Sequence, residues 1–236
     1  MNPGSADPAS FNQADLAAYD AELQQGLALS GETKSYFAQS RLDWLAGRLQ
    51  SLGRPAPRRI LDYGCGGGDT TLLLARMWPE ARVLGTDLSA SLIAAARRAD
   101  PEGKCRFRVL REMDPDEQFD LVYCNGVFHH IPVPDRPQTS AWIFRRLASG
   151  GLFSLWENNS WSPAARMVMR RIPFDRDAVM LSPRTARRLL CQAGFAVMNC
   201  DYLFFLPHVL RWARTLEPRL CKFPLGAQFH LLCQRA

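Results

Sequence analysis

Residues 60–71 read Ile-Leu-Asp-Tyr-Gly-Cys-Gly-Gly-Gly-Asp-Thr-Thr, an apolar strand start that leads through one acid into a glycine-rich turn and a polar helix start. Four of the five residues from 64 to 68 are glycines, so the turn can take positive φ and let a ligand approach its backbone N–H groups. Asp69 or Thr70 can cap the helix that follows. This order predicts a nucleotide-binding βα unit.

A second short strand, predicted over 82–86, ends at Asp87, nineteen residues after Gly68. A carboxylate about 20 residues after a glycine turn is the group that holds the two ribose hydroxyls in a βαβ nucleotide site. Asp87 is therefore the predicted ribose ligand.

The glycine spacing discriminates between nucleotides. A dinucleotide-binding turn has the pattern Gly-x-Gly-x-x-Gly, which leaves a helix N-terminus for the pyrophosphate. Gly64 and Gly66 fit this pattern, but Asp69 stands at the third glycine position. Because a carboxylate there would repel a diphosphate, the spacing favours a ligand without phosphates.

The chain resembles the class I S-adenosylmethionine-dependent methyltransferases, whose first motif is a hydrophobic strand, an acid and Gly-x-Gly-x-Gly. The similarity covers about residues 32–202, and several motifs in order make it specific. Those motifs are the first at Asp62, Gly64, Gly66 and Gly68, the ribose acid at Asp87, the fourth at 119–126, and the turn and fifth strand at 150–155.

The resemblance implies S-adenosylmethionine as cofactor and a role for each matching residue. The implied contacts are Gly64, Cys65 and Gly66 with the methionine part, Asp62 with its amino group, Asp87 with the ribose, Leu88 with an adenine face, and Asn125 beside the sulfonium. An acid after the third strand usually holds the adenine amine, and Glu112 and Asp114 are both candidates. Core packing is the alternative role for Leu88.

The pattern of strands and helices predicts an α/β fold with a doubly wound, mostly parallel seven-stranded sheet, similar to a Rossmann fold. We expect a disordered tail over 1–10, N-terminal cap helices over 11–57, and a methyltransferase domain over 58–236 with lid inserts at 158–181 and 203–226. Helices are predicted at 11–30, 34–52, 69–78, 89–99, 137–148 and 182–193, and strands at 59–64, 82–86, 105–110, 119–124, 151–157, 195–202 and 227–234. The last strand is expected to insert as an antiparallel edge.

Composition limits the class of protein. Apolar residues make up 47% of the 236 residues and charged residues 22%, which is ordinary for a globular protein without a membrane span. The N-terminus has neither a basic start nor an apolar run, so we expect a cytoplasmic protein. Seven cysteines without a Cys-x-x-Cys pair argue against a zinc or disulfide framework.

The net charge of +6 suggests attraction to an anionic surface or substrate, but nucleic acid is not an expected partner. Residues 204–222 mix arginine with apolar side chains and could contact an anionic membrane surface or a partner protein. An ordinary amphipathic segment that covers the sheet is the alternative. The sequence indicates no oligomeric state.

Three residues near the strand ends are candidates for a catalytic base. His129 and His130 follow the fourth strand, and imidazole can accept a proton at neutral pH. We favour His130, because the resemblance includes similar His-His pairs. Glu157 ends the fifth strand and is the other candidate. The alternatives are structural histidines and a Glu157 that holds Arg166 or caps the insert.

The insert over 158–181 predicts an acceptor with an anionic part and an apolar body. It carries Trp161 and Phe174 together with Arg166, which suits such a molecule. The Asn-Pro-Pro-Tyr sequence of many amide and adenine methyltransferases is absent after the fourth strand. We therefore expect biosynthetic methylation of a small-molecule or lipid-like acceptor at oxygen, with nitrogen or carbon methylation of a secondary metabolite as the alternative.

Overall fold

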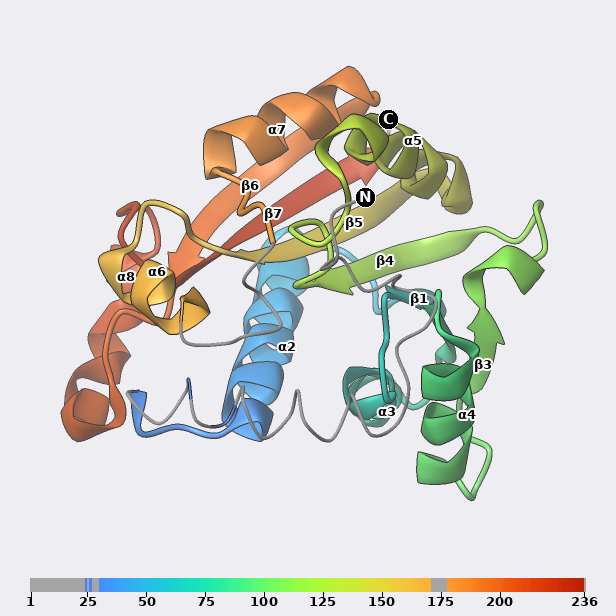
Figure 1. The fold of residues 1–236 in the computed structure, drawn as a ribbon, viewed down its shortest axis with the longest axis horizontal. Coiled ribbons are helices and arrows are strands. Elements are labelled where there is room, and N and C mark those ends of the chain that lie inside the picture. The colour runs from blue at the N-terminus through green and yellow to red at the C-terminus, as the bar shows by residue number, and fades with distance from the viewer. Residues whose placement is uncertain (1–23, 25, 27–29, 171–177, 236) are drawn as a thin grey trace, which may run out of the picture.

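The computed structural model describes residues 24, 26, 30–170 and 178–235 of the chain (Figure 1). The predicted tail over 1–10, most of the helix predicted over 11–30, and Phe174 lie outside these residues.

A seven-stranded sheet with the order β3-β2-β1-β4-β5-β7-β6 forms the centre of the fold. Strands β1 to β5 pair in parallel, and β7 pairs antiparallel with both β5 and β6. The predicted mostly parallel sheet is confirmed. The strands are β1 Arg59–Tyr63, β2 Arg82–Asp87, β3 Arg106–Val109, β4 Phe119–Asn125, β5 Leu147–Asn158, β6 Phe195–Leu203 and β7 Gln228–Arg235.

The last strand is antiparallel as predicted, but its expected position at the sheet edge is wrong. β7 lies between β5 and β6, and the described edges of the sheet are β3 and β6. The sequence of β7 explains this position, because Phe229, Leu231, Leu232 and Cys233 are all fully buried. A nearly continuous apolar run is typical of a strand that has neighbours on both sides and cover on both faces.

Helices cover both faces of the sheet (Figure 1). The α-helices are α2 Lys34–Ser51, α3 Asp69–Met77, α4 Ala90–Ala99, α5 Arg136–Arg146, α6 Pro163–Met169, α7 Pro183–Gln192 and α8 Glu217–Leu220. Short 3₁₀ helices are η3 Leu110–Glu112, η4 Val133–Asp135 and η6 His208–Leu216. Ser89 and Ser182 begin α4 and α7 by accepting a hydrogen bond from a backbone N–H of the first turn, as N-cap residues do.

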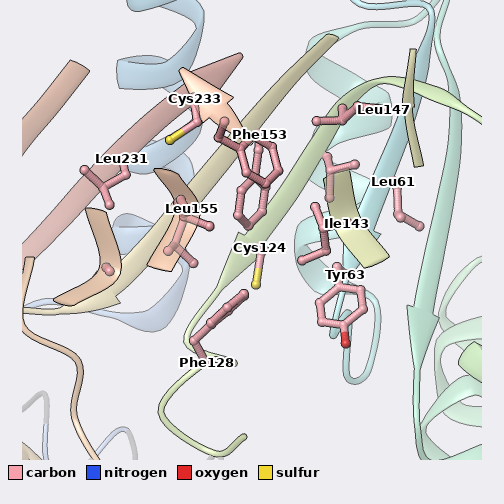
Figure 2. Close-up of a cluster of buried hydrophobic side chains, with 14 of the residues drawn as sticks. Leu61, Tyr63, Cys124, Phe128, Ile143, Leu147, Phe153, Leu155, Leu231 and Cys233 are labelled. Atoms are coloured by element: carbon pink, nitrogen blue, oxygen red, sulfur yellow. The ribbon is translucent and has the colours of Figure 1, made fainter. Parts of the chain in front are cut away.

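The two faces of the sheet have separate hydrophobic cores, because successive strand residues point to opposite sides. Leu61 and Tyr63 of β1 pack with Ile143 of α5, in the cluster that Figure 2 shows. Ile60, the residue before Leu61 in the strand, packs on the other face with Leu45 of α2. The helices α2, α5 and α7 are thus held to the sheet by buried apolar area.

A buried carboxylate ties α2 to the second insert. Asp201 of β6 accepts hydrogen bonds from Arg48 at 2.7 and 2.9 Å, from Trp44 at 3.1 Å and from Lys222 at 2.6 Å. Burial alone would raise the pKa of Asp201, but Lys222 and Arg48 outweigh it and hold the pKa below its ordinary value. The segment after β6 therefore has a fixed position beside α2.

Across the described part of the chain, each helix is too short or too polar to cross a membrane.

Candidate functional site

Four strand ends bring the predicted site residues to one edge of the sheet. Gly64 follows β1, Asp87 ends β2, Asn125 ends β4, and Glu157 stands next to the last residue of β5. These strands are neighbours in the order β2-β1-β4-β5 and run parallel. In open α/β sheets, ligands bind outside these carboxyl ends, at the point where the strand order reverses.

The glycine turn between β1 and α3 is built as the sequence predicts. Gly64, Gly66 and Gly68 have φ values of 76°, 53° and 89°, which side chains rarely tolerate. A Cβ on Gly64 would lie 2.4 Å from Val127, so this glycine lets the turn pack against the segment after β4. A Cβ on Gly66 would have no atom within 4 Å. The backbone at Gly66 therefore borders open space that a ligand can enter.

The predicted cap of α3 by Asp69 or Thr70 is wrong. The helix is capped at Gly68, and Asp69 is its first residue. Because Asp69 is already helical, its side chain turns outward and forms an ion pair of 2.8 Å with Lys34 at the start of α2. This ion pair joins the beginning of α2 to the glycine turn.

Asp87 holds the glycine turn from the neighbouring strand. Its two carboxylate oxygens accept hydrogen bonds from the backbone N–H groups of Gly66 and Ser89, each at 3.0 Å. Burial raises the pKa of Asp87, and these N–H groups oppose that shift. An ionised carboxylate can accept about four hydrogen bonds. Asp87 can therefore hold the turn and two ligand hydroxyls at once.

Two buried acceptor groups beside the turn fit a cationic ligand. Asp62 is 3% exposed and accepts a hydrogen bond of 2.7 Å from the Thr71 hydroxyl. Burial raises the pKa of Asp62 to about 7, against the opposing effect of Thr71. The side-chain oxygen of Asn125 is buried and has no hydrogen-bond partner among the described residues. A ligand that carries an ammonium and a sulfonium would find acceptors here.

The remaining predicted cofactor residues differ in exposure. Leu88 is 48% exposed, so the alternative role in core packing is wrong for it. Cys65 packs with Ile93 and Phe107, and burial raises the pKa of its thiol. Only backbone groups of Cys65 are therefore assigned to the cradle. Glu112 lies in the turn after β3 with an exposed side chain.

His129 and Glu157 form a buried pair between β4 and β5. Nδ1 of His129 lies 2.6 Å from Oε2 of Glu157, and Oε1 of Glu157 accepts the backbone N–H of Phe128 at 2.8 Å. Both side chains are nearly inaccessible to solvent. The described partners of Glu157 are thus on the turn after β4, and the alternative in which it holds Arg166 is not what the structure shows.

His130 lies beside this pair. Its ring centroid is 4.1 Å from that of His129, and its backbone N–H donates to the carbonyl of Val127. The turn that carries both histidines is held further by the backbone N–H of Val179, which donates to the carbonyl of His129 at 3.0 Å. The structure therefore places both predicted histidines at the site.

Sequence reasoning missed Arg136, which fastens this region. Its side chain is 5% exposed and donates to the carbonyls of Ile131 at 2.9 Å and Val179 at 2.7 Å. A buried arginine at the start of a helix has no sequence pattern that separates it from an exposed one. Arg136 holds the chain around Val179 against the histidine turn.

Two predicted substrate residues of the first insert, Trp161 and Arg166, lie in different surroundings. Trp161 stacks on Tyr202, with ring centroids 6.5 Å apart, and the guanidinium of Arg184 lies over the Trp161 ring, 5.4 Å from its centroid. Arg166 lines a surface hollow of about 500 Å³ with Pro163, Met167 and Arg170. The structure does not bring Trp161 and Arg166 into one described cavity.

Asn159 joins the bases of the two inserts and was also missed. Its side-chain amide donates to the carbonyls of Pro224 at 3.0 Å and Gly226 at 2.9 Å. Its backbone N–H donates to Ala227. The start of the first insert and the end of the second therefore have fixed relative positions.

Comparisons with known proteins agree with this geometry. A family model described as "Methyltransferase domain" matches residues 60–151. Trans-aconitate 2-methyltransferase of Azoarcus sp. (strain BH72) is 29% identical over 67% of this chain and 60% of its own length. The enzyme of the same name from Variovorax paradoxus (strain S110) is 33% identical over 50% of this chain and 45% of its own length. The chain thus spans less than two thirds of these curated relatives.

Solved structures share the fold. Magnesium protoporphyrin IX methyltransferase from Synechocystis PCC 6803, solved with bound SAH, is 16% identical and superposes with a TM-score of 0.66 over 97% of this chain and 98% of that chain. A TehB-like SAM-dependent methyltransferase from Corynebacterium glutamicum is 22% identical, with a TM-score of 0.60 over 94% of this chain and 98% of that chain.

The raised pKa of Asp62 predicts a stability change in the ligand-free protein. Because the folded protein keeps this proton up to about pH 7 while the unfolded chain loses it near the ordinary pKa of 3.8, stability falls as the pH rises between these values. We expect Asp62→Asn to raise Tm at pH 8 by at least about 2 °C, with a smaller gain at pH 5. Thermal denaturation at both pH values measures it, with the exposed Glu80→Gln as control. Equal losses of Tm at both pH values would contradict the assignment of a buried, uncompensated carboxylate.

Proposed function

Because the chain belongs to the class I S-adenosylmethionine-dependent methyltransferase family, we propose that it transfers the methyl group of S-adenosylmethionine to an oxygen of a small anionic acceptor. The observation that carries this proposal is the cradle around Gly66. There the open side of a positive-φ turn, the doubly held Asp87 carboxylate and the buried Asp62 meet at the strand ends.

The cradle matches the parts of the cofactor one by one. Asp87 would accept the ribose hydroxyls, and Asp62 would face the methionine amino group from its buried position. Leu88 offers an exposed apolar surface that suits an adenine face. The orphaned oxygen of Asn125 would point its partial negative charge toward the sulfonium. We assign the adenine amine to Glu112, with Asp114 as the alternative.

Two observations support an anionic acceptor. The curated relatives named above are called trans-aconitate methyltransferases, and trans-aconitate is a small carboxylate. In this chain, Arg166 and Arg170 line the hollow on α6 beside the apolar Pro163 and Met167. Guanidinium groups bind carboxylates with paired hydrogen bonds, and the apolar neighbours suit a hydrocarbon or lipid-like body. We propose that the inserts over 158–181 and 203–226 together form the acceptor side of the site.

When bound, the cofactor supplies an activated methyl group on a positively charged sulfur. The chain has to align the acceptor oxygen, exclude water and, for a hydroxyl acceptor, remove one proton. We assign the proton to Nε2 of His129, because Glu157 engages Nδ1 and can stabilise the imidazolium that forms. The sequence favours His130, but Glu157 contacts His129, so His130 becomes the second candidate.

A carboxylate acceptor would need no base, because it is ionised at neutral pH. The two acceptor classes therefore differ in their dependence on His129. A methyl ester is also hydrolysed by mild alkali, whereas N-methyl and C-methyl products are stable. Release of methanol by mild alkali thus identifies a carboxylate acceptor, and mass spectrometry of an alkali-stable product separates a methyl ether from the alternatives at nitrogen and carbon.

Loss of the ribose ligand tests the cofactor assignment. Hydrogen bonds to a charged group contribute about 1.5–3 kcal/mol each, so Asp87→Ala should weaken S-adenosylhomocysteine binding at least tenfold. Isothermal titration calorimetry measures the affinity, and Glu80→Gln serves as the matched exposed control. Wild-type affinity in Asp87→Ala, or binding of NAD in preference to S-adenosylhomocysteine, would remove Asp87 and the cofactor from the proposal.

The acceptor side is tested on Arg166. With radiolabelled S-adenosylmethionine and a panel of trans-aconitate and other small carboxylic and hydroxy acids, we expect Arg166→Ala to raise the acceptor KM about tenfold or more. The affinity for S-adenosylhomocysteine should not change. Arg82→Ala, at an exposed position on the first residue of β2, is the control. A lower cofactor affinity with an unchanged acceptor KM would contradict this division of labour.

The base assignment predicts a different pattern for each acceptor class. For a hydroxyl acceptor, His129→Gln should lower kcat by about 10²–10⁴, and raising the pH should restore part of the rate as the acceptor ionises. Wild-type kcat should fall at acidic pH, where protonation of the imidazole removes the base. His130→Gln should have the smaller effect.

A carboxylate acceptor should give a flat pH profile above about pH 5 and less than a tenfold effect of either histidine. Wild-type rates in both histidine variants with a hydroxyl acceptor would show that His129 is not the base. A larger loss in His130→Gln than in His129→Gln would return the assignment to His130.

A further inference from the structure

The segment after β6 exposes its apolar side chains instead of burying them. Seven of the twelve exposed large hydrophobic residues of the described chain lie within 209–225. Five of them recur at intervals of three or four residues along η6, α8 and the loop after them, and the side chains of all five are exposed. We call these five the outer stripe: Val209, Trp212, Leu216, Leu220 and Phe223.

The opposite side of the same turns carries the polar and anchoring residues. Arg214 pairs with Glu32 at 2.8 Å and lies over the ring of Tyr36 at 4.7 Å. Glu217 accepts the backbone N–H of Leu206 at 3.0 Å, and Cys221 is buried. In a typical surface helix the apolar face packs on the core and the polar face meets solvent. In this segment the apolar side chains are exposed and the charged anchors face the body of the protein.

These inward contacts also fix the segment as a unit. Glu32 accepts a second bond from His208 at 2.8 Å, and Lys222 reaches Asp201 at 2.6 Å. These contacts link the segment to Glu32, just before α2, and to Asp201 of β6. The position of the segment is therefore fixed by bonds to the body of the protein. Val209 and Trp212 remain 78% and 76% exposed in this fixed arrangement.

Cations accompany the outer stripe. Between residues 204 and 225 the sequence has three arginines and one lysine against a single acid, and that acid, Glu217, is the inward residue described above. Arg211 and Arg219 are exposed on the same segment, whereas Arg214 and Lys222 form the inward ion pairs described above. Long basic side chains can keep their charge at an anionic headgroup layer while apolar neighbours enter beneath it.

We propose that the outer stripe docks on the surface of an anionic phospholipid bilayer. Trp212 and Phe223 would enter the boundary between headgroups and acyl chains, and Arg211 and Arg219 would pair with lipid phosphates. A tryptophan among aliphatic side chains with flanking arginines is the composition that binds membrane interfaces through apolar area and charge together. The five side chains come from two short helices and a loop, and a lipid bilayer can adapt to such an irregular surface.

The docking surface stands next to the acceptor side of the site. Asn159 at the start of the first insert bonds the carbonyls of Pro224 and Gly226, directly after the last stripe residue. Figure 1 shows α6 and α8 at the same end of the molecule. An enzyme held in this orientation would meet an acceptor with a lipid-like body at the membrane, but the docking itself does not depend on the proposed methyl transfer.

Flotation with vesicles tests the proposal on the full chain. The wild type should float with vesicles of phosphatidylglycerol and phosphatidylcholine in equal parts, bind less at high salt, and bind pure phosphatidylcholine at least about tenfold more weakly. Trp212→Ser/Phe223→Ser should lower binding to anionic vesicles at least about tenfold, and Arg211→Glu/Arg219→Glu should lower it similarly.

Matched controls keep the test specific. Val133→Ser removes an apolar side chain that is 54% exposed on η4, and Arg82→Glu reverses an exposed charge on β2. Both should bind as the wild type does, and all variants should keep the wild-type Tm. Failure of the wild type to bind anionic vesicles would overturn the proposal, as would undiminished binding in the Trp212→Ser/Phe223→Ser variant. Concentration-dependent self-association that this variant abolishes, without vesicle binding, would instead assign the stripe to a second copy of the chain.

Discussion

Two backbone N–H groups, those of Gly66 and Ser89, converge on the carboxylate of Asp87, and the arrangement of the site depends on this contact. It fastens the glycine turn after β1 to the end of β2, so the open side of Gly66 keeps its position without a ligand. Preorganisation of this kind lowers the entropy that binding would otherwise cost. Because the same carboxylate would accept the ribose hydroxyls, one residue both shapes the cradle and binds within it.

The proposed acceptor side is organised by contacts between segments that are distant in sequence. Glu157 holds the histidine turn, Arg136 holds the chain around Val179 to that turn, and Asn159 joins the two inserts. Each is a polar group that is buried and satisfied, so each fixes geometry more than it adds stability. The outer stripe is the exception, because there the apolar side chains face outward and the charged anchors face the body.

The sequence predicted much of the fold, because the glycine turn, the strand-helix alternation and the apolar runs are local patterns. The position of β7 between β5 and β6 was missed, since the order of strands depends on packing among distant segments. Asp69 has the right residue type for a cap but lies one position inside the helix. His129, His130 and Glu157 were predicted from their places at strand ends, and the structure brings the three side by side. The sequence did not predict that Glu157 pairs with His129, because 28 residues separate them and only the parallel pairing of β4 with β5 brings them together.

The central claim is that the cradle around Gly66 binds S-adenosylmethionine, and a crystal structure of the chain with S-adenosylhomocysteine tests it most directly. The account predicts the two ribose hydroxyls within hydrogen-bond distance of Asp87, the amino group on the side of Asp62, and the adenine against Leu88. Density for the nucleoside away from the β1 and β2 ends, or a ribose that makes no contact with Asp87, would contradict it.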